Sequence, residues 1–90
     1  MIRAVVTVVG KDTVGIMAKV AGRCALSNAN VIDVSQTVME DIFSMVMLIH
    51  IGNLSCEFDR FVTSMKELGG DLGLKIHVMH EDIFNSMHRV

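Results

Sequence analysis

The chain has 90 residues, about half of them apolar, and a formal net charge of −2 with charges of both signs scattered along it. A chain this short forms one domain and buries only about 60–65% of the surface that its unfolded form exposes, so association with a second chain is a natural way to add burial. Because there is no basic block, the electrostatic footprint of a nucleic-acid-binding protein is missing.

The two cysteines, Cys24 and Cys56, make neither a disulfide framework nor a CxxC pair, so we expect free thiols in a reducing compartment. The N-terminal segment lacks the organisation of a signal peptide. The longest apolar run, 42–51, is about half as long as a membrane-spanning helix. We therefore expect a soluble, cytoplasmic protein with a single domain over 1–90 and no membrane partner.

In chain order, the first elements are a strand and a helix. Residues 2–9 are rich in β-branched side chains and predict a strand bounded by Gly10. Apolar residues then recur at helical spacing and predict a helix over 14–28, with Asp12 as its N-cap.

A β-hairpin is predicted next. Residues 31–39 alternate, which places Ile32, Val34 and Val38 on one side of a strand. Glu40–Asp41 predicts a turn, and 42–51 predicts the strand that pairs with the first.

The second half predicts a helix, a strand and a short C-terminal helix. Ser55 is expected to cap the helix, with Glu57 and Asp59 in its first turn, and Gly69–Gly70 is expected to stop it. Its apolar stripe consists of Phe58, Phe61, Val62, Met65 and Leu68. A strand over 74–79 and a helix over 81–90, capped by Asp82, complete the chain.

The order βαββαβ predicts the α+β class and a ferredoxin-like sandwich, in which right-handed crossovers place two helices on one face of a four-stranded antiparallel sheet. The other face is also partly apolar, through Val5, Val9, Val46 and Leu48. We expect the C-terminal helix to cover part of it with Ile83, Phe84 and Met87. Because a large exposed apolar patch needs a partner, the rest predicts a homo-oligomer, most simply a two-fold dimer.

The segment between the first strand and the first helix is the candidate ligand site. A helix N-terminus offers unpaired N–H groups and positive potential to a carboxylate, and Asp12 could receive an ammonium group, which together describe an amino acid. Gly10 permits a tight turn and Gly15 permits a close approach. The lining residues would be Gly10, Lys11, Asp12, Thr13, Val14, Gly15 and Ile16. The alternative is purely structural: Asp12 only caps the helix, and Gly15 only lets the helix pack closely on the sheet.

Other chemistries lack the residues they need. His77 and His80 lie three apart on a predicted strand and face opposite ways, and His88 sits near a helix end, so we expect no metal site. No serine lies in a GxSxG context, neither cysteine has an evident activating neighbour, and the GKDTVG loop lacks the ending of a phosphate-binding loop. RNA-recognition domains stack bases on several aromatic residues of their strands, whereas the predicted strands here carry only one. The sequence therefore does not favour RNA binding. We expect no cofactor and no enzymatic activity.

The stretches VVGKDTVGIMAKVA and NANVIDVSQ resemble the signature of ACT domains, a strand leading to D-x-x-G, an amphipathic helix, then Asn and an Ile-rich strand. These positions are Asp12, Gly15, Asn30 and Ile32. The form is similar to ACT segments of formyltetrahydrofolate deformylase and of the glycine-cleavage repressor. It is closer to uncharacterised small proteins that consist of one ACT domain, whose tails look like EDIFNSMHRV.

The resemblance implies a regulatory domain that binds an amino acid or related small metabolite at a subunit interface, where Asn30 would reach the loop of a neighbouring subunit. In one departure, Thr13–Val14 stands where arginine and proline are common, which changes the polarity beside the loop. No enzyme domain lies within these 90 residues, so any output would pass to a separate protein partner. The alternative function is a ligand-free module for dimerisation or protein interaction.

Overall fold

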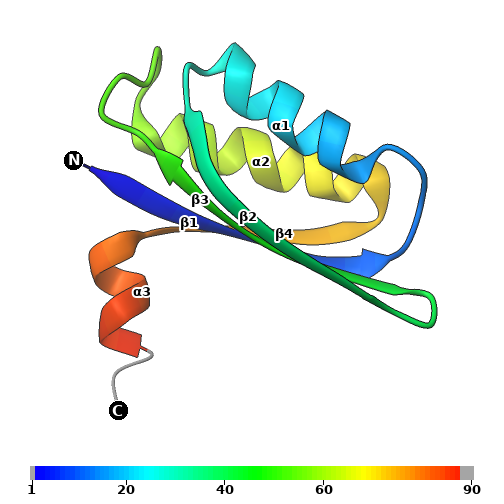
Figure 1. Ribbon diagram of the computed structural model, residues 1–90. Helices are drawn as coiled ribbons and strands as arrows, with labels where there is room; N and C mark the ends of the chain where they lie inside the picture. Colours follow the sequence, from blue (N-terminus) through cyan, green and yellow to red (C-terminus); the bar gives the residue numbers. More distant parts are fainter. Residues whose placement is uncertain (1, 88–90) are drawn as a thin grey trace.

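The computed structural model describes residues 2–87 and divides them into four strands and three helices (Figure 1). In chain order these are β1 (Arg3–Lys11), α1 (Ile16–Leu26), β2 (Asn30–Met39), β3 (Ile42–His50), α2 (Phe58–Leu72), β4 (Leu74–His80) and α3 (Glu81–Met87). The strands form one antiparallel sheet in the order β2-β3-β1-β4. Helices α1 and α2 cover one face and α3 lies against the other, here called the open face. The expected ferredoxin-like fold is confirmed.

The core lies between the sheet and the helix pair α1–α2. In β1, Ala4, Val6 and Val8 point to the helices and are fully buried, as the alternating pattern predicts. From β3, Phe43, Met45, Met47 and Ile49 join them, and the helices add Ile16, Val20, Cys24, Phe61, Met65 and Leu68. Methionine is unbranched and adaptable, which suits it to filling the gaps between two crossing helices and a twisted sheet.

In β2 the expected alternation fails at its start. Val31 and Asp33 pair with consecutive residues of β3, so Ile32 is the extra residue of a β-bulge. A bulge shifts the side-chain phase by one residue. Val31 therefore packs against the core and Ile32 is 42% exposed, so the prediction that Ile32 and Val34 share one face is wrong.

Helix α1 ends at Leu26, two residues earlier than expected, because Asn28 adopts a left-handed conformation with φ of 59°. The Asn28 side-chain amide donates to the carbonyl of Asn53 over 2.7 Å. This contact ties the end of α1 to the loop before α2.

Helix α2 begins later than predicted. Its first residue is Phe58 and Glu57 occupies the N-cap position, so the expectation that Ser55 caps it is wrong. The Ser55 backbone N–H instead donates to the carbonyl of Ser27 over 3.0 Å, which anchors the preceding loop to α1. Asp59 lies in the first turn of α2, as expected.

The glycine pair Gly69–Gly70 does not stop α2, contrary to expectation. The helix runs through it to Leu72 and ends at Gly73, which has φ of 70°. Gly69 faces β4, and a Cβ atom there would lie 2.8 Å from the carbonyl oxygen of Leu74. Glycine at position 69 therefore lets the helix lie directly on the neighbouring strand.

Helix α3 is joined to the open face by three side chains. The Nδ1 atom of His80 accepts the N–H of Asp82 over 3.3 Å, so the cap is His80 and not Asp82. Arg3 forms an ion pair with Glu81. Phe84 is half-buried, whereas Ile83 and Met87 are 55% and 65% exposed, so the expected cover comes from Phe84 and not from the other two. The predicted extension to residue 90 lies outside the described residues.

Within residues 2–87, no helix is long and apolar enough to cross a membrane. Cys24 and Cys56 are both free, in agreement with the expectation from their spacing. Burial raises the pKa of the Cys24 thiol to about 11.

The two neighbouring glycines of α2 provide a matched test of the contact with β4. A Cβ atom at Gly70 meets nothing within 4 Å, whereas one at Gly69 meets backbone. We expect Gly70→Ala to keep or raise the free energy of unfolding, since alanine favours helix. We expect Gly69→Ala to be less stable than Gly70→Ala by about 1–3 kcal/mol, because overpacking forces the elements apart. Urea denaturation of both variants measures the difference, and equal stabilities would contradict the close contact.

Stability should also fall at high pH through Cys24. Its thiol has a pKa of 9.0 when unperturbed and about 11 in the folded protein, so the folded state holds the proton more tightly. The resulting stabilisation is present below pH ~9 and is lost as pH rises through ~11, on the order of 3 kcal/mol in all. Urea unfolding at a series of pH values should show a smaller decline for Cys24→Ala than for Cys56→Ala. Identical declines would argue against a buried neutral thiol.

Candidate functional site

The predicted ligand loop lies where β1 ends and α1 begins. Gly10 and Lys11 are the last residues of β1, residues 12–15 form the connection, and Ile16 is the first residue of α1. Gly10 does not form the tight turn that was expected. A Cβ atom there would lie 2.5 Å from the Leu74 side chain, so this glycine allows the start of β4 to pair closely with β1.

Asp12 does not cap α1, because β1 continues to Lys11 and leaves Asp12 four residues before the helix. Its backbone N–H donates to the carbonyl of Asp41 over 2.7 Å, which fastens the loop to the β2–β3 turn. The side chain of Asp12 is exposed. The Asp12 carboxylate therefore does not cap α1, so the alternative in which Asp12 serves only as a cap is wrong.

Gly15 occupies the N-cap position of α1, with φ of 84° and no side-chain cap. A left-handed residue there favours glycine, and apart from its two chain neighbours no atom of residues 2–87 lies within 4 Å of where its Cβ would be. The alternative role of Gly15, closer packing of the helix on the sheet, is therefore wrong. The space beside the first turn of α1 is open to a ligand or to another chain.

The first turn of α1 carries no acidic residue. Its N–H groups lack partners within the helix, and the helix dipole adds positive potential there. Val14 is 98% exposed and Thr13 is exposed, while Ile16 is buried and anchors the turn to the core. The backbone N–H groups at the start of α1 can bind the carboxylate of a ligand. The Asp12 carboxylate lies in the same connection, four residues before the helix.

Asn30 lies at the other end of the sheet. It pairs with His50, which pairs with Arg3 at the start of β1, whereas the loop follows the last residue of β1. Eight residue steps along a strand correspond to about 26 Å. Within one chain, the structure therefore brings residues 10–16 together but not Asn30, which could meet the loop only from a neighbouring subunit.

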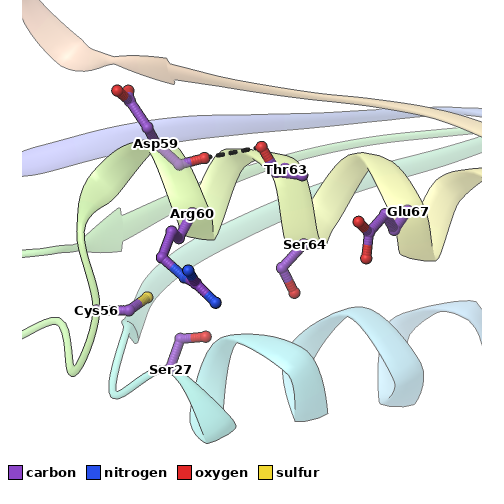
Figure 2. Close-up of a pocket in the computed structure, with 7 residues that line it drawn as sticks. All are labelled: Ser27, Cys56, Asp59, Arg60, Thr63, Ser64 and Glu67. Carbon is purple, nitrogen blue, oxygen red and sulfur yellow. Dashed lines mark hydrogen bonds between the residues drawn. The ribbon is translucent and has the colours of Figure 1, made fainter.

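A groove between α1 and α2, missed by the sequence analysis, opens on the helical side of the sheet (Figure 2). It has a volume of about 510 Å³ and is lined by Ser27, Cys56, Asp59, Arg60, Thr63, Ser64 and Glu67. Beside it, Nη1 of Arg23 donates to Oγ of Ser64 over 2.8 Å, which bridges the two helices. Helical spacing could place Arg23 away from the core, but only the packing of α1 on α2 reveals this partner.

The described residues include no group of three or more His, Cys, Asp or Glu side chains that could hold a metal ion. His77 lies on the open face opposite Thr7, whereas the His80 side chain accepts a hydrogen bond at the start of α3. The two imidazoles therefore have different surroundings. His88 lies outside the described residues. The raised pKa of Cys24, caused by burial, keeps that thiol protonated at neutral pH and unsuited to nucleophilic chemistry.

Comparison with known proteins agrees with this architecture. The family model described as "ACT domain" matches residues 3–79. Two UPF0237 proteins are similar along their length: one from Methanococcus maripaludis is 44% identical, covering 100% of both chains, and one from Listeria innocua is 47% identical, covering 98% of this chain and 99% of its own. A solved ACT domain protein from Streptococcus pneumoniae has a TM-score of 0.80 at 34% identity, covering 92% of this chain and 93% of its own. The chain therefore belongs to the ACT domain family, whose members are typically regulatory domains that bind small molecules.

Proposed function

We propose that this chain is a stand-alone regulatory domain that binds an amino acid or related small metabolite at a homo-oligomer interface and signals to a separate protein. The observation that carries the proposal is the start of α1, where the first turn holds no acidic residue and a Cβ atom on Gly15 would meet open space. A ligand carboxylate fits the N–H groups and a ligand ammonium fits Asp12. On this proposal the chain is not an enzyme.

The interface is proposed along the edge of β2. A two-fold axis that pairs two β2 edges antiparallel sets the Asn30 end of one strand beside the Met39 end of the other. Met39 precedes the turn whose Asp41 carbonyl is bonded to Asp12. Asn30 would then approach the loop of the partner, which supports a shared site completed by two subunits.

The chemistry of the β2 edge supports this pairing. Residues 34–39 carry no charge, proline or bulge, the features that usually protect an edge strand.

Two free cysteines fit a reducing compartment, and we propose a cytoplasmic location on that ground.

A second candidate function is a ligand-free interaction module. Its support is the exposed apolar surface of the open face and α3, which includes Val9, Val46, Ile83 and Met87. An apolar area of this kind favours contact with another protein whether or not a metabolite binds.

A thermal-shift screen against the twenty amino acids and common metabolites distinguishes the two functions. A ligand at ten times its Kd adds about 1.4 kcal/mol to stability, which corresponds to roughly 6–11 °C in Tm for a domain of this size. We expect one zwitterionic compound to raise Tm by that amount. Asp12→Asn should abolish the rise, whereas Asp71→Asn, an exposed carboxylate on α2, should leave it unchanged. A flat screen on a stable dimer would favour the interaction module.

Solution mass tests the proposed interface. We expect a dimer, and we expect Ser35→Lys combined with Thr37→Lys to yield monomers, because like charges across paired strands repel. Ala18→Lys on the exposed side of α1 is the control and should remain dimeric. Sedimentation equilibrium measures the masses. A wild-type monomer, or a dimer untouched by the paired lysines, would contradict an interface along β2.

A further inference from the structure

Two hollows meet at the edge strand β4, away from the loop of residues 12–15. The first, of about 250 Å³, lies on the open face against α3 and is lined by Val5, Thr7, His77, Met79 and Phe84. The second, of about 340 Å³, runs along the outer edge of β4 and is lined by Lys66, Gly70, Leu74, Lys75, Ile76 and His77. His77 is the residue that lines both hollows.

The hollow against α3 is apolar at one end and polar at the other. Val5 lies opposite Met79 in the pairing of β1 with β4, and Thr7 lies opposite His77. Phe84 of α3 closes the apolar end, and Val5 is buried there although it is absent from the main core. A short alkyl or aromatic group in this hollow would contact the apolar side chains of Val5, Met79 and Phe84.

The hollow along the edge is cationic. Lys66 comes from α2 and Lys75 from β4, and neither forms an ion pair with any residue in the described part of the chain. Among residues 2–87, no acidic side chain lines either hollow. Glu81, which follows the far end of β4, is paired with Arg3. The potential there therefore favours an anion, with the His77 imidazole as an additional hydrogen-bonding group.

We propose that the two hollows form one binding site for a small amphipathic anion. A carboxylate or phosphate would bind Lys66, Lys75 and His77, and a short apolar tail would lie beneath α3 between Met79 and Phe84. Together the volumes fall within the range of roughly 300–1,000 Å³ that is typical of small-molecule sites. The site combines an apolar wall with a few convergent polar groups. Its lining includes Leu74, the pairing partner of Gly10, but none of residues 12–15 of the ligand loop.

Hexanoate and hexyl phosphate are suitable probes, with acetate and hexanol as controls that lack the tail or the charge. Titration of ¹⁵N-labelled protein should give saturable shifts at Thr7, His77, Met79 and Phe84 with either probe, and none at residues 12–15. Acetate and hexanol should bind at least about fivefold more weakly, because each satisfies one half of the site. The probe that binds more tightly identifies the head group.

Matched variants locate both halves of the site. Lys66→Met combined with Lys75→Met should weaken hexanoate binding by about tenfold, the loss expected when charged hydrogen bonds are removed. Lys19→Met, on the exposed side of α1, should leave binding unchanged. Thr7→Val tests the polar end without disturbing α3, and Phe84→Ala tests the apolar wall.

Three results would overturn the proposal. They are hexanol binding as tightly as hexanoate, shifts confined to residues 12–15, or equal weakening by Lys19→Met and the double lysine variant. Since the loop and the β4 hollows have separate reporter residues, failure here is distinguishable from failure of the proposed amino-acid site.

Discussion

Strand β1 is the element on which the other layers rest. It pairs with β3 along one edge and with β4 along the other, so its backbone is bonded on both sides. Its side chains are also buried on both faces of the sheet. Ala4, Val6 and Val8 pack in the core beneath the helices, and Val5 is buried on the open face. A strand that is apolar on both faces needs cover on both. Helices α1 and α2 supply one cover, and α3 supplies part of the other.

The partial cover on the open face divides the sheet into two kinds of edge. On the β4 side lie an apolar hollow beneath α3 and a second hollow lined by two lysines. On the β2 side, a long strand ends the sheet without lysine or proline, which suits pairing with a second chain. The ligand loop is bonded to the β2–β3 turn, so it belongs to the side on which a subunit is proposed to add. The proposed subunit interface and the proposed anion site therefore lie at opposite edges of one sheet.

The helix starts were the least predictable features, and for a common reason. Asp12, Ser55 and Asp82 are residues that often cap helices, yet none of them caps here. In the first two cases a backbone hydrogen bond from a distant segment holds the residue instead, to Asp41 and to Ser27 respectively. In the third, the His80 side chain accepts the bond. Local propensity could not anticipate these partners, because they are distant in sequence or depend on how the chain turns.

The sequence by itself determined the order of the elements, the side-chain faces of β1 and β3, the main apolar stripe of α2 and the family. These features follow from period-2 and period-3.6 patterns and from the loop motif, which are local properties of the chain. It also indicated that both sheet faces are apolar. Only the tertiary structure decided that Ile32 forms a bulge, that Gly69 marks a contact with β4, and that Asn30 lies far from the loop. Each of these depends on strand register or on helix packing. Both bring residues from distant segments into contact, so the pattern of one segment cannot predict them.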